Sequence, residues 1–557
     1  MGIHVNPDKS GFSEVIKQYY TDKTGLITYF NSVLSTKEKE IMFSRPRRFG
    51  KTITCNMLAA YYSVGAKSEK LFKGLEIEKD PSFKIHLNKH PVISFDLLAF
   101  KDDWSGQDND WSDFDGNKPT LIQYIKNTIV KEIIEEYPEV QIAPTSSLRK
   151  AMLAVSQYLK SEETENTPDQ DDTVLETDFH KFVVIIDEWD LILREEKDNP
   201  STVEDYIKFL RSLFRSQDTS FYLAGAYMTG ILPIIRYNTQ SALSDFKERT
   251  MLKPLMLAEY VGFTKEDVQR VCRKFGADEQ LMREWYDGYS LPGVGEVYCP
   301  SSVMEAAKND DYSSHWTVTA AMEAMTNYIY ADLDGLADAM NKLLDGENVP
   351  IDPTAFQNRL DQVDTRDKVL TVLVHLGYLA YDDYAGTVRI PNLEVRLQML
   401  NAFKESPNKE FFQRIERSEK LLAAAKGNDA GTVAEVLKEI HDERPPIHYN
   451  NEQALRYVVL MGFNNSPRSR YTSFEELSSG QGYVDILFKP QKQSSEIPML
   501  VELKYGESTS KAIGQIYDKD YIAHLRKEGY HGNVLLVGIN YSPYTKEHTC
   551  RIEKIQI

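Results

Sequence analysis

The chain has 557 residues, a length that predicts about three to four domains because a single hydrophobic core stops growing at roughly 250–300 residues. Its residues are 41% hydrophobic and 27% charged, as in soluble globular proteins. The formal net charge of -19 argues against a protein that coats nucleic acid by general neutralisation of phosphates, but it is compatible with a local basic groove.

The cysteines and the apolar runs narrow the class of protein further. The four cysteines are far apart and form no C-x-x-C pair, so neither a zinc site nor a disulfide framework is expected. The longest apolar runs, FVVII and VLLVGI, have the length of strands and fall far short of the roughly 18 residues needed to span a bilayer. We therefore expect a cytoplasmic protein without a membrane partner.

The first chemical motif is FSRPRRFGKT, residues 43–52. Its end fits the phosphate-binding loop G-x-x-x-x-G-K-[ST], in which backbone N–H groups and the Lys approach phosphates while the hydroxyl reaches Mg²⁺. Gly50, Lys51 and Thr52 match this pattern, but Arg45 replaces the first glycine. A G-K-T in a basic loop also arises by chance, so the neighbouring elements decide its meaning.

Those neighbouring elements have the required order of strand, loop and helix. The residues EIMFS, 40–44, predict a short buried strand before the loop. After Lys51, the run TITCNMLAAYYS predicts a helix. Its apolar residues at helical spacing are Ile53, Met57, Leu58 and Tyr61.

Two further buried strands end in polar residues. KFVVIIDEWD has a continuous apolar run, Val183 to Ile186, followed by Asp187 and Glu188. Asp187 is expected to hold Mg²⁺ through water, and Glu188 to orient and deprotonate an attacking water. SFYLAGAYMTGILPI predicts a strand ending at Thr229, where a hydroxyl could sense a terminal phosphate. Together these elements predict an ATP site.

The middle of the chain contains helices and one hairpin. FTKED predicts a capping box with Thr264 at the N-cap, and the helix after it turns Val268, Val271 and Cys272 inward. KVLTVLVHLGYLAYDDYAGTVRIPNLEVR predicts a helix followed by a hairpin at DDYAG, the pattern of a winged-helix unit. Such a unit either binds DNA or packs within the molecule, and both alternatives stay open here.

A second chemical centre follows near the C-terminus. GYVDILFKP predicts an alternating strand that carries Asp485, and PMLVELKYG a buried strand on which Glu502 and Lys504 share one face. A carboxylate on one strand and E-x-K on the next resemble the site of PD-(D/E)XK nucleases. There the acids bind Mg²⁺ and the Lys steadies the attacking water or the charge that develops on the phosphate.

The elements around these strands agree with the same nuclease fold. NNEQALRYVVLMGF predicts a helix that carries Glu452, the position of the first-helix acid in that fold. KAIGQIYDKDYIAHL predicts a later helix that carries Gln515 and Tyr521 and resembles the last motif of the superfamily. The centre either cleaves nucleic acid or serves as a binding module, because proteins of this superfamily also keep the fold without cleavage.

Nearly the whole chain resembles the predicted AAA-ATPase-like proteins of bacteria. The segments that carry the resemblance are RPRRFGKT, IIDEWD, YMTGILPIIRYNTQSALSDF, EYVGFT, WYDGY, HLGYLAY, IPNLEVR, LSSGQGYVDI and VELKYG. In that family the Arg-rich loop is the normal form of the phosphate loop. The resemblance implies a nucleotide site formed by Arg47, Arg48, Phe49, Gly50, Lys51, Thr52, Asp187 and Thr229. Arg47 and Arg48 either face the phosphates or form structural ion pairs.

The predicted fold class is α/β, with a parallel P-loop NTPase sheet, a helical lid and winged-helix-like middle region, and a C-terminal α/β nuclease-like domain. The expected boundaries are 1–250 for the ATPase domain, 251–400 for the lid and wing, 401–443 for a helical connector and 444–557 for the nuclease-like domain. The catalytic candidates are Glu188, Glu452, Asp485, Glu502, Lys504 and Gln515, and the metal ligands Thr52, Asp187, Asp485 and Glu502.

Three functions are compatible with this sequence. The first is an ATP- and Mg²⁺-dependent ATPase coupled to a nuclease that acts on nucleic acid, with DNA favoured over RNA. The second is a signalling or scaffold ATPase whose C-terminal domain binds nucleic acid or a partner without cleavage. The third is a regulator that binds DNA through the wing. A homo-oligomer is compatible with all three.

Overall fold

The computed structural model describes residues 2–557 apart from a set of short gaps. The gaps are 107–110, 112–113, 115, 167–177, 197–198, 235, 238–239, 242, 317–332, 345, 357–359, 404–408, 443–451, 465–470, 480–481 and 491–495. The chain forms two compact units. Unit 1 contains Met1–Arg273, Asp287–Val303 and Asn348–Pro391; unit 2 contains Lys274–Tyr286, Met304–Glu347 and Asn392–Ile557. The domain boundaries expected after residues 250, 400 and 443 remain predictions.

Unit 1 is built on a five-stranded sheet in the order β2-β3-β4-β1-β7, in which every neighbouring pair is parallel. Its strands are β1 (Glu40–Ser44), β2 (Val92–Asp96), β3 (Phe182–Asp187), β4 (Leu223–Gly230) and β7 (Lys247–Arg249). The three strands predicted around the ATP motifs are therefore confirmed, with β4 ending one residue after Thr229.

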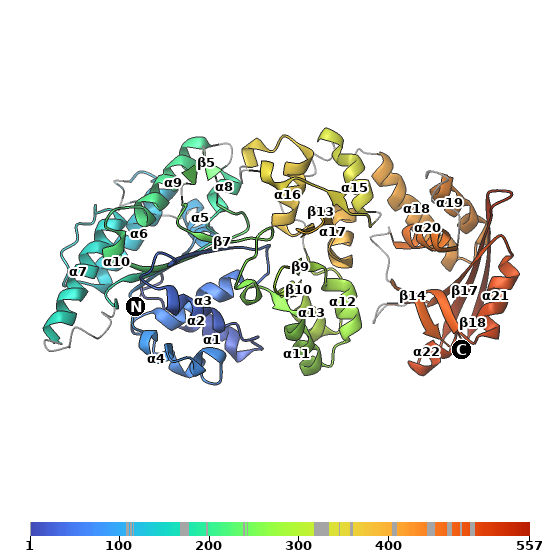
Figure 1. The fold of residues 1–557 in the computed structure, drawn as a ribbon, viewed down its shortest axis with the longest axis horizontal. Coiled ribbons are helices and arrows are strands. Elements are labelled where there is room, and N and C mark those ends of the chain that lie inside the picture. Colours follow the sequence, from blue (N-terminus) through green and yellow to red (C-terminus); the bar gives the residue numbers. More distant parts are fainter. Residues whose placement is uncertain are drawn as a thin grey trace. The chain divides into compact units, whose positions relative to one another are not determined.

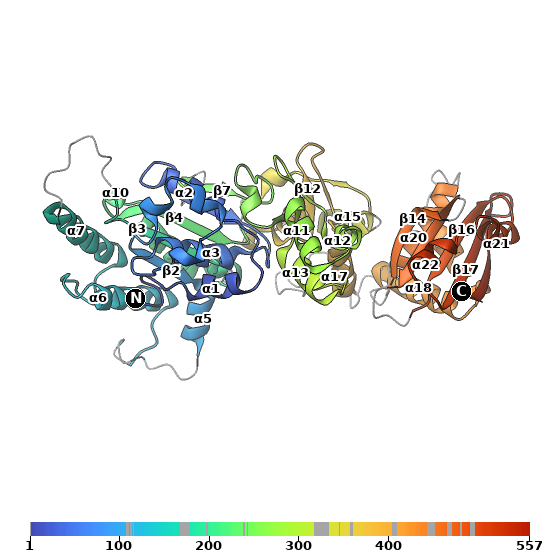
Figure 2. The same cartoon turned by 90° about the horizontal axis from the view of Figure 1, so that it is seen from below.

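Helices cover both faces of this sheet, so its strands are buried on two sides and read as continuous apolar runs. Figures 1 and 2 show α1 to α4 on one face and α6, α7 and α9 on the other. The helices of this layer structure are α1 (Ser10–Lys17), α2 (Gly25–Val33), α3 (Lys51–Tyr62), α4 (Phe83–His86), α5 (Leu97–Ser105), α6 (Leu121–Glu136), α7 (Leu148–Asn166), α8 (Leu191–Glu195), α9 (Pro200–Phe214) and α10 (Thr219–Tyr222).

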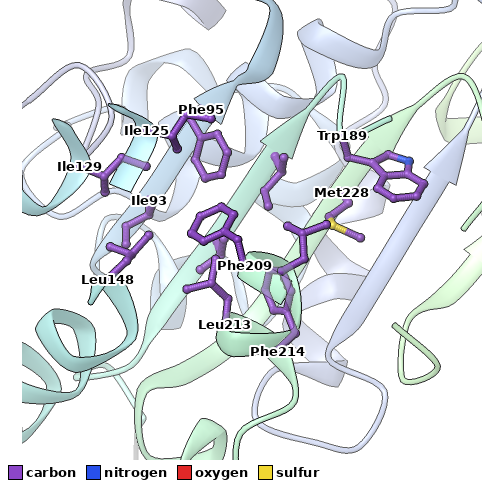
Figure 3. Close-up of a cluster of buried hydrophobic side chains, with 14 of the residues drawn as sticks. Ile93, Phe95, Ile125, Ile129, Leu148, Trp189, Phe209, Leu213, Phe214 and Met228 are labelled. Atoms are coloured by element: carbon purple, nitrogen blue, oxygen red, sulfur yellow. The ribbon is translucent and has the colours of Figure 1, made fainter. Parts of the chain in front are cut away.

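The core on the second face fixes the sheet against its helices. Figure 3 shows Ile93 and Phe95 of β2 and Met228 of β4 packed with side chains of α6, α7 and α9. These partners include Ile125, Ile129, Leu148, Phe209 and Leu213. On the opposite face, α3 buries Met57, Leu58 and Tyr61 as predicted, but Ile53 is 38% exposed. Its helical spacing alone did not place it in the core.

The remainder of unit 1 contains small antiparallel sheets and further helices. Thr264 and Asp267 form the predicted capping box at α11 (Lys265–Phe275), since each backbone N–H donates to the other side chain. The predicted helix and hairpin are α16 (Arg366–Leu376), β12 (Ala380–Asp382) and β13 (Thr387–Arg389). The remaining strands are β5 (Arg236–Tyr237), β6 (Gln240–Ser241), β8 (Phe263–Thr264), β9 (Tyr289–Leu291), β10 (Gly295–Tyr298) and β11 (Val349–Pro350).

Unit 2 contains a second five-stranded sheet, in the order β14-β15-β16-β17-β18, whose only parallel pair in the described chain is β16 with β17. Its strands are β14 (Tyr471–Ser479), β15 (Gly482–Pro490), β16 (Met499–Tyr505), β17 (Asn533–Ser542) and β18 (Glu547–Gln556). Its helices include α15 (Leu336–Leu344), α17 (Leu393–Phe403), α18 (Lys409–Lys426), α19 (Ala430–Asp442), α20 (Glu452–Asn464), α21 (Thr509–Asp518) and α22 (Ala523–Lys527), together with α12 (Glu279–Tyr286); α13 (Pro300–Asn309) spans both units.

Two predictions for unit 2 need correction. Residues 484–488 of β15 are buried without interruption, whereas the sequence suggested alternation, because helices pack against both faces of the sheet. Tyr521 lies in the turn after α21 and not on the helix that carries Gln515, although the two side chains still meet through a hydrogen bond of 3.1 Å. Across the described ranges, no helix is long and apolar enough to cross a membrane.

The buried His375 of α16 predicts a pH dependence of stability. Neither ring nitrogen has a hydrogen-bond partner among the described residues, and burial lowers the pKa of this imidazole to about 4. Because its pKa in the unfolded chain is about 6.5, stability is complete above that pH and falls by up to about 1.4 kcal/mol per unit as the pH drops toward 4. His375→Leu should weaken this dependence in urea unfolding at pH 7.5 and pH 5. The matched change at the exposed His531, His531→Leu, should leave it unaltered.

Candidate functional site

The phosphate loop connects the end of β1 to the start of α3. Gly50 precedes the helix in the left-handed conformation, with φ of +89°, which glycine adopts without the steric cost of a Cβ atom. The first helical residue is Lys51, so the backbone N–H groups at the N-terminus of α3 lie beside the loop. This arrangement is the anion-binding geometry expected of a phosphate loop.

Four predicted residues meet at the carboxyl edge of the sheet. The hydroxyl of Thr52 donates to Oδ2 of Asp187 at 2.5 Å. The Nζ atom of Lys51 lies 3.7 Å from Oε1 of Glu188, and it donates to the carbonyls of Arg45 and Pro46 at 3.3 and 3.1 Å. The segments after two different strands therefore bring a hydroxyl, a cation and two carboxylates close together.

The parallel register explains why these residues meet. β4 lies between β1 and β3, and Thr229 of β4 is directly opposite Phe43 of β1. The Thr229 hydroxyl donates to the Phe43 carbonyl at 3.1 Å, which ties the ends of these two strands together. Since parallel strands present their carboxyl ends at one edge, the loop after β1 and the acids after β3 converge there.

Burial sets the electrostatics of the carboxylate that meets Thr52. It raises the pKa of Asp187 to about 6, against the lowering effect of the hydrogen bond from Thr52. A neighbouring carboxylate, Asp96 at the end of β2, adds to the increase and is the register partner of Asp187. The Asp187 side chain is therefore an oxygen ligand whose charged form would be stabilised by a cation.

A cleft of about 500 Å³ opens beside this cluster. Thr52 and Asp187 form one wall, and Asn56 of α3, Asp96 of β2 and Ser10 of α1 extend it. Thr52 and Asp187 are the members of the cluster that line this cleft, so the cleft adjoins the cluster on their side.

The arginines of the loop have different environments. Arg45 is fully buried and donates to the carbonyls of Ser44, Arg249 and Val261 at 3.0, 3.4 and 3.3 Å. Burial lowers its pKa to about 10. Arg47 is exposed and forms no ion pair with the described residues, whereas Arg48 is exposed with a left-handed backbone at φ of +67°. Arg45, which stands where the general loop pattern has its first glycine, thus holds the loop to the segments around Arg249 and Val261.

Phe49, the remaining loop residue, points into the protein. Its side chain is 1% exposed, and its ring contacts Tyr289 edge-on at a centroid distance of 5.6 Å. Only the backbone of Phe49 is left for contact with a phosphate.

The second centre lies on β15, β16 and α20 of unit 2. The Asp485 carboxylate accepts hydrogen bonds from the backbone N–H of Leu503 at 2.8 Å and from Arg456 at 3.0 Å. Lys504 donates to Oε1 of Glu502 at 3.0 Å, which agrees with their shared face of β16. The other carboxylate oxygen of Glu502 is buried and has no hydrogen-bond partner among the described residues.

The charges of this centre are coupled. Burial, followed by the charge of Asp485, raises the pKa of Glu502 to about 7. The same two causes raise the pKa of Glu452, the first residue of α20. Burial acts to lower the pKa of Lys504, but the charge and hydrogen bond of Glu502 raise it above its usual value. Gln515 lies at the margin and donates to the hydroxyl of Tyr521 at 3.1 Å.

Two arginines in these centres were not predicted. Arg194 of α8 contacts Glu188 at 2.6 Å, and Arg456 of α20 links Asp485 to Glu476, with a distance of 2.5 Å to the latter. Arg456 follows Glu452 by four residues, so helical spacing placed both on one face. Arg194 follows Glu188 across the start of α8, and no local pattern singles it out.

Among the described residues, no group of side chains is large enough to hold a metal by itself. Nowhere in the described part of the chain do three His, Cys, Asp or Glu residues gather as a metal site. Thr52 with Asp187, and Asp485 with Glu502, each supply two oxygen donors. Such pairs suit Mg²⁺, which is usually bound by one or two carboxylates while substrate phosphates and water fill the other positions.

Comparison with known proteins agrees with this description of unit 1. Residues 10–239 match the family model described as Predicted AAA-ATPase, which is less than half of the chain. None of the curated proteins compared with the chain matches it.

Two solved structures are similar at low identity. One is the Walker-type ATPase PABY2304 of Pyrococcus abyssi, with 13% identity, a TM-score of 0.28, and coverage of 68% of this chain and 94% of that one. The other is the Aeropyrum pernix ORC2 protein in ADPNP–ADP complexes, with 11% identity, a TM-score of 0.29, and coverage of 73% and 98%.

The environments of Arg45 and Arg47 predict opposite results for two substitutions. Arg45→Gly restores the glycine of the general loop pattern, but it leaves three carbonyls without their donor and a void in the core. We expect a loss of about 2–4 kcal/mol of unfolding free energy and no gain in ATP affinity. Arg47→Ala should change stability by less than about 0.5 kcal/mol.

Thermal unfolding without nucleotide and equilibrium binding of ATP together check both variants. A stable Arg45→Gly protein that binds ATP more tightly would contradict the structural role of Arg45. For Arg47, a large loss of stability with unchanged ATP affinity would exclude contact with the phosphates.

Proposed function

We propose that this protein is a magnesium-dependent ATPase whose nucleotide site lies at the carboxyl edge of the parallel sheet. The observation that carries the proposal is the contact of Thr52 with Asp187 beside Lys51 and Glu188. A hydroxyl, a cation and two carboxylates, next to the N-terminus of a helix, are the groups that phosphoryl transfer requires. The match of residues 10–239 to an ATPase family supports the same conclusion.

Each residue of this cluster has a distinct proposed role. Lys51 leaves the loop carbonyls and binds the terminal phosphates as a point charge, assisted by the backbone N–H groups of the loop. Thr52 and Asp187 would hold Mg²⁺, which when bound neutralises charge on the phosphates. Glu188 orients water and accepts its proton. Thr229 holds the ends of β1 and β4 together through its hydroxyl, and its proposed role is to sense the terminal phosphate from there.

Substitutions at Lys51 and Glu188 should separate binding from hydrolysis. Lys51→Ala removes the charge that meets the phosphates, so ATP affinity should fall by at least about tenfold. Glu188→Gln keeps the shape of the side chain but cannot accept a proton, so ATP binding should persist while kcat falls by about 100-fold or more. Fluorescence titration with ATP and a phosphate-release assay measure the two effects. Unchanged ATP affinity in Lys51→Ala would refute the loop assignment.

The second centre supports a further activity, the metal-dependent cleavage of nucleic acid, with DNA favoured over RNA. The observation behind it is the buried carboxylate oxygen of Glu502 that has no hydrogen-bond partner within the described part of the chain, close to the charge of Asp485. Two carboxylates that repel each other in a buried position favour a cation between them. Asp485 and Glu502 would hold Mg²⁺, Lys504 would stabilise charge on the phosphate, and Glu452 and Gln515 would border the substrate.

A binding module without cleavage is the alternative for this centre, since Arg456 already neutralises one oxygen of Asp485. The third function, DNA binding through the wing, receives less support. Arg366 and Lys368 of α16 pair with Asp367 and Asp364, and the hairpin turn itself contains Asp382 and Asp383. Such a surface is poorly suited to DNA phosphates.

The contacts of Asp485 determine which variant tests the nuclease function. If repulsion between the two carboxylates acted alone, Asp485→Ala would be as stable as the parent. That substitution, however, also removes the acceptor of the Leu503 N–H and leaves Arg456 unpaired, so it should destabilise unit 2. Asp485→Asn keeps an acceptor oxygen and is therefore the better test.

We expect Asp485→Asn in the intact protein to lose cleavage of labelled DNA in Mg²⁺ or Mn²⁺ by at least about 100-fold. The matched control is Asp518→Asn, which changes an exposed residue on α21 and should cut like the parent. Single- and double-stranded DNA and RNA should be tested with and without ATP. A parent protein that cuts none of them with either metal, but binds one, would favour the binding module.

A further inference from the structure

A continuous network of ion pairs and hydrogen bonds connects Glu188 to the segment after β4. Oε2 of Glu188 accepts a hydrogen bond from Nη2 of Arg194 at 2.6 Å, and Nε of the same guanidinium donates to Oδ2 of Asp190 at 2.9 Å. Asp190 in turn accepts the backbone N–H groups of Ile231 and Leu232 at 3.1 and 2.9 Å. These contacts join the ends of two strands, β3 and β4, through one arginine.

The ion pair between Arg194 and Asp190 is shielded from solvent. The side chain of Asp190 is fully buried and that of Arg194 is 6% exposed, so water and salt screen their charges little. Burial acts to lower the pKa of Arg194, but the charges of Asp190 and Glu188 raise it above its usual value. The guanidinium therefore stays charged between its two carboxylates, and its fork geometry serves both at once.

Glu188 itself has a constrained backbone. Its φ is +50°, the left-handed region that a residue with a Cβ atom enters at a steric cost. The next residue fixes this turn, because the N–H of Trp189 donates to the carbonyl of Thr229 at 3.1 Å. With Oε2 bound to Arg194, the other oxygen, Oε1, is the one that lies 3.7 Å from Lys51. One oxygen of the carboxylate is anchored and the second is turned toward the proposed phosphate position.

We propose that Arg194 is a positioning residue for ATP hydrolysis. It holds Glu188 in the orientation from which Oε1 accepts a proton from water. Through Asp190, that orientation depends on the backbone of Ile231 and Leu232. The inference rests on the proposed ATPase function. A movement of this segment would change hydrolysis through Asp190 and Arg194 without contact between the segment and the nucleotide.

Arg194→Lys tests the role because lysine keeps the positive charge next to Asp190 but has no fork that reaches two carboxylates. In the intact protein we expect kcat for ATP hydrolysis to fall by about 10- to 100-fold, with ATP affinity within about twofold of the parent. Arg211→Lys, on the exposed side of α9, is the matched control and should hydrolyse ATP like the parent.

The double variant Glu188→Gln/Arg194→Lys separates positioning from a structural role. If Arg194 acts through Glu188, the double variant should be no slower than Glu188→Gln alone, because residues that act as a unit are not additive. Independent, multiplicative losses would overturn the proposal, as would an Arg194→Lys protein with unchanged kcat. Should Glu188→Gln itself leave hydrolysis intact, the proposed role of Glu188 would fail instead, and the two failures are thereby distinguished.

Asp190→Asn provides a second route if Arg194→Lys does not fold. The amide oxygen can still accept the N–H of Ile231, which binds Oδ1 of Asp190, while the ion pair with Arg194 at the other oxygen position is lost. The proposal predicts a lower kcat at unchanged ATP affinity for the folded protein. An unchanged kcat in a folded Asp190→Asn protein would refute the coupling between the segment after β4 and Glu188.

Discussion

The hydrogen bond between Thr52 and Asp187 joins the first turn of α3 to the end of β3, and the candidate ATP site depends on it. It can form because only one strand, β4, lies between β1 and β3. The loop after β1 therefore reaches the acids after β3. The helices on both faces hold that spacing through a closely packed core. The arrangement of the site residues at the edge of the sheet therefore follows from the strand order and from the packing of helices on the sheet.

The sequence predicted this edge because each of its parts has a local signature. A fully buried parallel strand must be apolar along its whole length, so the acids of DEWD stand out directly after FVVII. The positive φ at residue 50 favours glycine, and Lys51 and Thr52 follow it at the spacing of the phosphate-loop pattern. In unit 2, Glu502 and Lys504 were recognisable as a pair because side chains two positions apart in a strand lie on the same face.

The features that the sequence did not reveal depend on contacts between distant segments. Arg45 resembled part of a basic anion-binding loop, yet it is buried against carbonyls that belong to residues more than 200 positions away in sequence. Arg456 is an ordinary helical arginine until the fold brings it to Asp485, and Arg194, although close to Glu188 in sequence, has no local pattern that marks their contact. Ile53 has helical spacing with Met57 but projects outward, since only one stripe of α3 meets the sheet.

In both centres an arginine side chain holds one oxygen of a carboxylate. Arg194 does so for Glu188 and Arg456 for Asp485, each from a helix beside the strand end or strand that carries the acid. Each arginine thereby fixes the direction of the carboxylate that it contacts. At Asp485 the second oxygen accepts the backbone N–H of Leu503, whereas at Glu188 the second oxygen faces Lys51.

The central claim is that Lys51, Thr52 and Asp187 form one magnesium-dependent ATP site in each chain. Titration calorimetry of the intact protein with ATP, in Mg²⁺ and again in excess chelator, tests it most directly. The account predicts one ATP bound per chain in Mg²⁺, with affinity at least about tenfold lower in chelator because ATP then lacks the ion that Thr52 and Asp187 would hold. Absence of binding in Mg²⁺, or equal affinity in both conditions, would contradict it.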